Sequence, residues 1–142
     1  MKLLLDTNVV LDIALKRQPF YKAAARVFDA SNFGTVHLFI TASIATDLYY
    51  ILRKQKDHEM AIAFIKDLLT CADACKVDKG TLLEAISSGF TDFEDAVQSF
   101  AAVESAVEVI LSRNKDDFGS SSLTVLTPIE FVEDHLAQLL DS

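Results

Sequence analysis

Acidic residues stand at the ends of several predicted strands in this 142-residue chain. Asp6 directly follows the apolar run 2–5, and Asp47 lies near the start of the helix predicted after a second strand-like run. Two later groups of residues lie beside another predicted strand: Asp92, Glu94 and Asp95 before it, and Asn114, Asp116 and Asp117 after it. Segments that are far apart in the sequence would therefore bring their acids to one rim of a sheet.

Carboxylates gathered at one rim repel one another, and their pKa values rise unless a divalent cation offsets the charge. Hard oxygen ligands of this kind suit Mg²⁺ or Mn²⁺. A cation held there can lower the pKa of a water molecule, orient that water and stabilise charge on a leaving oxygen. The residue types therefore predict metal-dependent hydrolysis of a phosphodiester.

Each acid, taken singly, also has a structural interpretation. Asp6 and Asp92 can be helix N-caps, Asp95 can be the third residue of a capping arrangement, and acids 116 and 117 can be loop charges. Thr7 and Asn8 can hydrogen-bond Asp6, or they can simply begin the helix. N-caps need not cluster in space, however, so the joint placement of these acids at strand ends favours a site.

The elements that must position these acids alternate along the chain. The apolar and β-branched runs predict strands at 2–5, 36–41, 75–77, 107–111 and 123–126. Helical periodicity and capping residues predict helices at 7–17, 19–32, 57–71, 80–88 and 92–103, another capped by Ser43, and a last one from Pro128. This alternation predicts one domain over residues 1–142, a three-layer α/β/α Rossmann-like sandwich around a central parallel sheet. Ligands of such sheets bind beyond the carboxyl ends of the strands.

Charge is distributed unevenly along the chain. The net charge is -8, yet residues 1–91 hold 11 Lys and Arg against 10 Asp and Glu, while residues 92–142 hold 2 against 11. Lys16, Arg17, Lys22 and Arg26 form a basic group, which predicts either a solvated helix face or contacts to a nucleic-acid backbone.

Other features narrow the classes of protein. Cys71 and Cys75 lack the spacing of a zinc site and are expected to be reduced packing residues. No apolar run reaches spanning length and the N-terminus lacks a signal-peptide pattern, so we expect a cytoplasmic protein without a membrane partner.

Four runs resemble a PIN domain over almost the whole chain: LLLDTNVVLDIAL at 3–15, DFEDAVQSFAA at 92–102, VILSRNKDDF at 109–118 and VLTPIEF at 125–131. The chain is most similar to the single-domain bacterial kind, the VapC toxins of toxin–antitoxin pairs. The resemblance implies an endoribonuclease that uses Mg²⁺ or Mn²⁺, an RNA substrate, a small antitoxin partner and a homodimer. The apolar helix positions 23–28 and 48–52 suit a dimer surface or the core equally well.

Carried over by position, the resemblance makes Asp6, Asp47 and Asp95 the first three catalytic and metal-binding acids. The fourth family position falls on Asn114, so Asp117, three residues further on, is expected to be the fourth carboxylate. Supporting positions are Thr7, Asn8, Asp92 and Asn114. Two of these positions depart from the family pattern: glutamate is common where Asp47 stands, and an acid is common where Asn114 stands. An amide offers a carbonyl oxygen but no charge, so a catalytically degenerate RNA- or protein-binding PIN module is the alternative.

Rival classes fit the sequence less well. A receiver-type signalling domain needs an acceptor aspartate after a central strand and a lysine after a late one; Asp78 is a poor candidate, and no lysine follows Leu126. A haloacid-dehalogenase-type phosphatase expects aspartate where Asn8 stands. The four glycines form no phosphate loop for a dinucleotide, and the three histidines are scattered.

Overall fold

A parallel β-sheet lies at the centre of the computed structural model, which describes residues 1–140. Its strands are β1 (Lys2–Leu5), β2 (His37–Ile40), β3 (Ala72–Ala74), β4 (Val109–Leu111) and β5 (Thr124–Leu126). They are hydrogen-bonded in the order β3-β2-β1-β4-β5, and every pair is parallel. Strand order reverses at β1, the strand that delivers Asp6.

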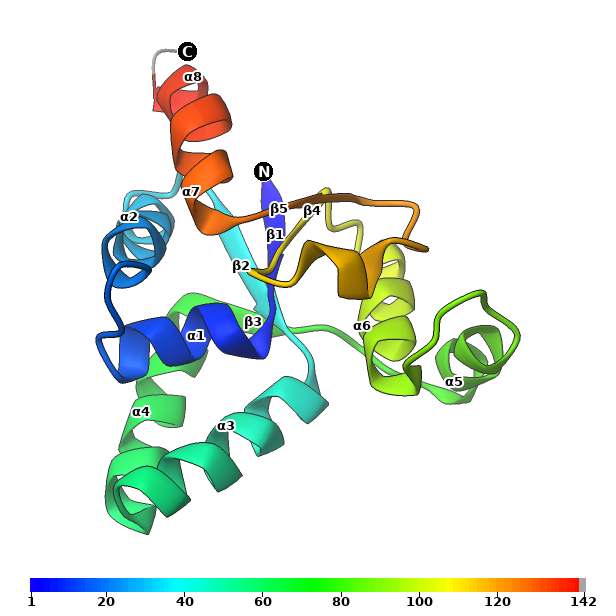
Figure 1. The fold of residues 1–142 in the computed structure, drawn as a ribbon, viewed down its shortest axis with the longest axis horizontal. Coiled ribbons are helices and arrows are strands. Elements are labelled where there is room, and N and C mark those ends of the chain that lie inside the picture. The colour runs from blue at the N-terminus through cyan, green and yellow to red at the C-terminus, as the bar shows by residue number, and fades with distance from the viewer. Residues whose placement is uncertain (141–142) are drawn as a thin grey trace.

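Helices cover both faces of this sheet (Figure 1). The bounds are α1 (Thr7–Ala14), α2 (Tyr21–Asn32), α3 (Ala42–Gln55), α4 (His58–Cys71), α5 (Lys79–Ile86) and α6 (Phe93–Glu104). A 3₁₀ turn, η1 (Lys115–Phe118), follows β4, and α7 (Pro128–Phe131), the π-turn η2 (Val132–Leu136) and α8 (Ala137–Leu140) end the described chain. Helices α1 to α4 lie on one side and α5 with α6 on the other. The predicted α/β/α sandwich is confirmed.

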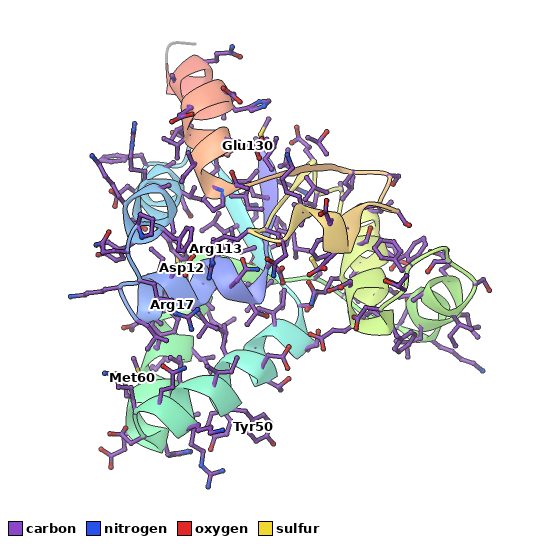
Figure 2. The ribbon with its side chains drawn as sticks, viewed as in Figure 1. Asp12, Arg17, Tyr50, Met60, Arg113 and Glu130 are labelled. Carbon is purple, nitrogen blue, oxygen red and sulfur yellow. The ribbon has the colours of Figure 1, made fainter. Side chains whose placement is uncertain are left out.

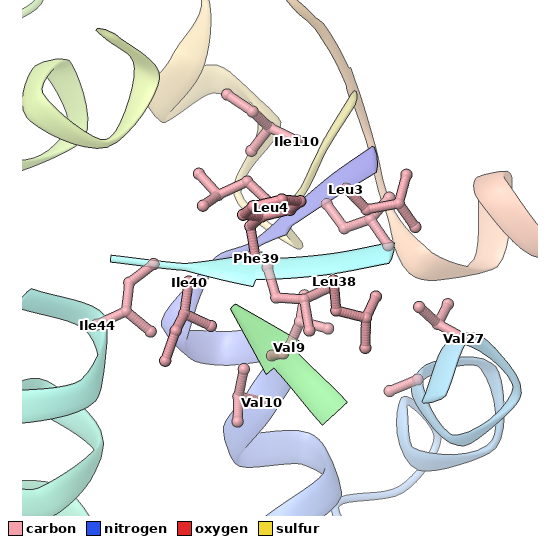
Figure 3. Packing of buried hydrophobic residues seen from close by; sticks show 14 of the residues in the cluster. Leu3, Leu4, Val9, Val10, Val27, Leu38, Phe39, Ile40, Ile44 and Ile110 are labelled. Carbon is pink, nitrogen blue, oxygen red and sulfur yellow. The ribbon is translucent and has the colours of Figure 1, made fainter. Parts of the chain in front are cut away.

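The core explains why the central strands read as unbroken apolar runs. Leu3, Leu4 and Leu5 are fully buried because β1 has neighbours on both edges and helices on both faces. Figure 3 shows Val9 and Ile44, from α1 and α3, packed near the same strands. None of the helices within residues 1–140 combines the length and apolar character needed to cross a bilayer.

Several predicted boundaries were wrong. The third strand is Ala72–Ala74 rather than 75–77, because pairing with β2 fixes it: Leu38 faces Ala72 and Ile40 faces Ala74. The first helix ends at Ala14 rather than at 17, and Lys16 has a left-handed φ of 50°.

Helices α2 and α3 also differ in detail from the prediction. Thr41, not Ser43, caps α3 by accepting from Ile44 N–H at 3.2 Å. The apolar positions predicted as either dimer surface or core belong to the core, since Ala23, Ala24, Val27, Leu48 and Leu52 are buried. Within the same stretches Phe28 and Ile51 are only partly buried and Tyr50 is 65% exposed, so the dimer surface stays a prediction.

Candidate active site

Asp6 sits at the point where the strand order of the sheet reverses. Its backbone N–H donates to the Leu111 carbonyl at 3.0 Å, which joins the ends of β1 and β4. Its Oδ1 accepts from Thr7 N–H at 2.8 Å, and its Oδ2 accepts from Ser112 Oγ at 2.8 Å and from Asn8 Nδ2 at 3.3 Å. Asp6 is thus an N-cap and a fixed strand-end carboxylate at once, and only 9% of it is exposed.

A network of polar groups ties the residues after β4 to the start of α1. Buried Ser112 also accepts from Asn114 N–H at 3.0 Å, and Arg113 N–H donates to Asn8 Oδ1 at 3.2 Å. Sequence reasoning missed Ser112. The sequence did contain an indication of its role, because Ser112 follows β4 as directly as Asp6 follows β1.

Electrostatic interactions link Asp6 to two other predicted acids. Burial is the main cause that raises the pKa of Asp6, while hydrogen bonds from Ser112 and Thr7 lower it. The charges on Asp117 and Asp47 raise it further. The carboxylates of α3, of η1 and of the end of β1 therefore face one region.

The third predicted acid, Asp95, lies in the first turn of α6. Asp92 caps this helix, as the sequence predicted, by accepting from Asp95 N–H at 2.9 Å. Burial, and then the charges on Asp92, Asp6 and Asp117, raise the pKa of Asp95 to about 7. The structure thus brings Asp6, Asp47, Asp95 and Asp117 into electrostatic contact from four segments.

Glu94 was expected at the rim of the sheet with Asp92 and Asp95, but unlike them it was given no role in the site. A hydrogen bond with the Asp47 carboxyl is the largest cause that raises the pKa of Glu94 to about 7, followed by burial. Charges on neighbouring acids add to the shift, and Gln98 Nε2 donates to Glu94 Oε1 at 3.3 Å. Asp47 therefore meets a second carboxyl, whose longer side chain extends from α6.

Asp6, Asp47, Asp95 and Asp117 are here called the acidic cluster. Their carboxylate oxygens are the kind of ligand that a hard divalent cation prefers. The acids raise one another's pKa values, and Asp6 is held by neutral donors that leave its charge uncompensated. Among residues 1–140 no three His, Cys, Asp or Glu side chains approach closely enough to enclose an ion by themselves. Mg²⁺ usually keeps several waters and uses only one or two carboxylates, so a site completed by water suits these residues.

A buried ion pair fixes the base of the site. Asp12 of α1 is fully buried, and Arg113 approaches it with Nε at 2.9 Å from Oδ2 and Nη2 at 3.2 Å from Oδ1 (Figure 2). Burial raises the pKa of Asp12, and the Arg113 charge opposes that shift. The Phe20 ring lies 4.0 Å from the Arg113 guanidinium carbon. The sequence indicated this pair in one respect: Asp12 interrupts the apolar pattern of α1, and a buried acid needs a partner.

The predicted RNA-binding cations are not all equally available. Arg17 Nη1 lies 4.0 Å from Asp12 Oδ1 and so serves the buried pair in part. Lys16 is exposed in the turn after α1, while Lys22 and Arg26 are exposed one helical turn apart on α2. Neither Lys22 nor Arg26 forms an ion pair with any group in the described part of the chain.

The fold and this site define an α/β/α domain whose sheet carries a carboxylate cluster where its strand order reverses. The family model described as PIN domain matches residues 2–116. The chain belongs to the PIN domain family. No curated protein sequence matches it.

Solved structures share this fold at low sequence identity. VapBC2 from Rickettsia felis, bound to a promoter DNA fragment, gives a TM-score of 0.69 at 13% identity, covering 89% of this chain and 98% of that chain. VapBC-1 from nontypeable Haemophilus influenzae gives 0.68 at 16% identity, covering 91% and 99%. Mycobacterium tuberculosis VapC20, a sarcin-ricin loop cleaving toxin, gives 0.60 at 14% identity, covering 76% and 86%.

Proposed function

We propose that the chain is a metal-dependent endoribonuclease and the toxin of a toxin–antitoxin pair. The observation that carries the proposal is the convergence of four acids from four segments, with Asp6 buried at the strand switch point and Asp95 raised in pKa to about 7 partly by its neighbours' charges. Such a cluster is costly unless a cation compensates it. The likeness to VapC20, which cleaves the sarcin-ricin loop, supports RNA as the substrate class.

In this proposal some residues of the chain would hold the metal and others would orient its ligands. Asp6, Asp95 and Asp117 would hold Mg²⁺ or Mn²⁺, one or two of them directly and the rest, like Asp47, through water. When bound, the metal supplies a more acidic water and offsets charge on the phosphate. Ser112 and Asn8 hold the Asp6 carboxylate in one orientation through hydrogen bonds of 2.8 Å and 3.3 Å.

Glu94 and Asp47 would act as a proton reservoir beside the metal-holding acids. The two carboxyls share a hydrogen bond, and the pKa of Glu94 of about 7 places its proton exchange at neutral pH. A group with a pKa near the working pH can both accept and release a proton. In the metal-free protein the pair can therefore bind or release one proton near neutral pH, and a bound cation would move this exchange to lower pH.

We also propose a small antitoxin partner, a homodimer and a cytoplasmic location. The support is that similar structures are complexes, VapBC2 and VapBC-1, each named for two components. Light scattering on the purified chain tests pairing directly: a dimer has twice the 15.7 kDa mass of one chain. A mass of one chain at micromolar concentration would contradict the homodimer without touching the nuclease proposal.

The nuclease proposal is tested by incubating the purified protein with single-stranded RNA. We expect the protein to cleave RNA with Mn²⁺ or Mg²⁺ and not to cleave it with chelator. In Asp6→Asn the cleavage rate should fall by a factor of about 10² or more. Asp29→Asn is the matched control, because this exposed acid on α2 lies outside the acidic cluster. If the parent cuts no RNA under saturating Mn²⁺ and Asp6→Asn binds metal as the parent does, the binding-module alternative replaces the nuclease.

A further inference from the structure

Three hollows adjoin one another between the acidic cluster and α2. The first is lined by Arg113, Asn114, Lys115, Asp116 and Asp117. The second, of about 220 Å³, is lined by Phe20, Arg113, Asn114, Thr127, Pro128 and Ile129. The third includes Pro19, Lys22, Arg26, Ile129 and Glu133 in its lining. Arg113 and Asn114 line both of the first two hollows and Ile129 lines both of the last two, so neighbouring hollows share walls; the three together are here called the track.

We propose that the middle hollow, here called the base pocket, binds one unpaired nucleobase of the RNA strand whose phosphate lies at the acidic cluster. This inference rests on the proposed ribonuclease function and names its substrate contact. Ligand pockets for drug-sized molecules begin at about 300 Å³. At about 220 Å³ the base pocket suits a single planar ring system rather than a whole nucleotide.

The walls of the base pocket have the chemistry that a base requires. Pro128 and Ile129 supply an apolar surface from α7. The Arg113 guanidinium lies over the Phe20 ring, 4.0 Å from its centroid, so the outer face of this stacked pair is the flat surface left for a base. The guanidinium cannot swing away, because Asp12 holds its Nε and Nη2. The platform is therefore in place before RNA arrives.

Asn114 supplies the polar edge of the base pocket. Its backbone is fixed by the bond from its N–H to Ser112 Oγ at 3.0 Å, while its side-chain amide makes no hydrogen bond within residues 1–140. An amide can donate to and accept from a base edge, whereas a carboxylate only accepts and would repel the adjoining phosphate. This gives the neutral residue at a commonly acidic family position a role in recognising the base.

Charge along the track matches a single strand of RNA. Lys22 and Arg26 line the hollow remote from the acidic cluster, together with one acid, Glu133. Both cations are exposed and form no ion pair within the described residues, so two positive charges against one negative leave this hollow able to neutralise a phosphate. Lys115 at the near end is already paired with Glu130 at 3.1 Å. The base would lie between one phosphate on α2 and the scissile phosphate.

The first test removes single bases from the RNA. A short oligonucleotide cut at one bond is prepared with an abasic residue at each position near that bond, and kcat/KM is measured for each. We expect one position at which loss of the base lowers kcat/KM by about tenfold in the parent, within the range that stacking gives. In the variants Ile129→Ala and Asn114→Ala, removing the same base should lower kcat/KM by less than about twofold. Val103→Ala, an exposed truncation on α6, should keep the parental pattern.

The second test does not depend on cleavage. Methyl NMR of the intact protein follows Ile129 and Thr127 during titration with nucleoside 5′-monophosphates and, in parallel, with ribose 5-phosphate. Shifts at these methyls with the nucleotides alone support the base pocket even if the protein proves catalytically inactive. Equal shifts with ribose 5-phosphate, or no shifts with either, would overturn it even if the protein cleaves RNA.

Discussion

The Asp6 carboxylate takes part in both the fold and the site. An ionised carboxylate offers about four lone-pair positions, and three donors occupy positions on Asp6: Thr7 N–H, Ser112 Oγ and Asn8 Nδ2. All three are neutral, so they orient the group without cancelling its charge. One lone-pair position remains for a cation, in a carboxylate that burial has already made hard to ionise.

Calorimetric titration with Mn²⁺ tests this arrangement residue by residue. Asp6→Asn and Asp95→Asn should each weaken Mn²⁺ binding by about tenfold or more. Asn114→Asp should strengthen it, because an added carboxylate beside Asp117 attracts the same ion. Parental affinity in both asparagine variants would remove Asp6 and Asp95 from the metal site.

The raised pKa values make the stability of the metal-free protein depend on pH. Asp95 and Glu94 titrate near 7 in the folded state but near 4 when unfolded. Between these values the folded state binds more protons, so the free energy of unfolding falls as pH rises from about 4 to about 7 and levels off above it. Thermal melts without metal should show this fall, and each decrease of 1 kcal/mol lowers Tm by about 2–4 °C.

Two variants and added Mn²⁺ test whether Asp95 and its neighbouring acids cause this dependence of Tm on pH. Asp95→Asn should flatten the fall, whereas Asp29→Asn should leave it as in the parent. Saturating Mn²⁺ should raise Tm most at pH 8, where the repulsion between carboxylates is greatest. A metal-free Tm that rises steadily from pH 5 to pH 8 would contradict the proposed electrostatics of the acidic cluster.

At the scale of elements, α1 and the segment after β4 behave as one unit. The Asp12–Arg113 ion pair joins them across the sheet edge, and Asn8 accepts from Arg113 N–H at 3.2 Å. Phe118, which is buried, anchors η1 in the core and so positions Asp117. The proposed metal-binding positions therefore depend on packing between side chains that are not themselves proposed ligands.

Removing Arg113 should destabilise the protein severely. Arg113→Met leaves Asp12 buried without its close partner, which costs about 3–5 kcal/mol of unfolding free energy. Arg17→Met, which removes only a charge 4.0 Å away that is a third exposed, should cost less than about 1 kcal/mol. Urea unfolding of both variants, and of Arg113→Met combined with Asp12→Asn, separates the cases. If the double variant is no more stable than Arg113→Met, the buried charge is not the cause.

At the scale of the whole molecule, the chain is acidic, whereas the RNA substrate that we propose is a polyanion. The net charge of -8 is concentrated in the last third of the sequence, and the fold places that acidity at the sheet edge and the C-terminal helices. Lys22 and Arg26 lie on α2, which packs against α7. We therefore expect the proposed RNA substrate to be attracted locally, along the track between α2 and the acidic cluster.

Charge reversal on α2 tests this local attraction. Lys22→Glu with Arg26→Glu, in an Asp6→Asn background that leaves RNA intact, should weaken RNA binding. It should also flatten the plot of log affinity against log salt by about 0.7 for each phosphate that the protein no longer neutralises. Arg53→Glu with Lys54→Glu on the end of α3 is the matched control. An equal effect of both pairs would mean that net charge alone governs binding.

The sequence alone was sufficient for features set by neighbouring residues. Strands 2–5 and 36–41, the helix capped by Asp92, and the placement of Asp6 at a strand end follow from periodicity and from capping, which act over a few residues. Parallel topology followed because alternating strands and helices have few ways to pack. The same edge rule placed Asp6 and Asp117, which follow strands, on one rim. The choice of Asp6, Asp47, Asp95 and Asp117 as the acids of one site came from the resemblance to PIN domains and stays a prediction.

Tertiary structure alone decided what depends on partners distant in sequence. Ser112 reaches Asp6, Arg113 reaches Asp12 and Asp47 meets Glu94 only after β1, β4 and α6 are assembled. The position of β3 came from its pairing with β2 rather than from its own composition. Desolvation, which raises the carboxylate pKa values, and the base pocket, which combines three separate segments, both come from packing. No local pattern encodes them, because the energies involved arise between elements.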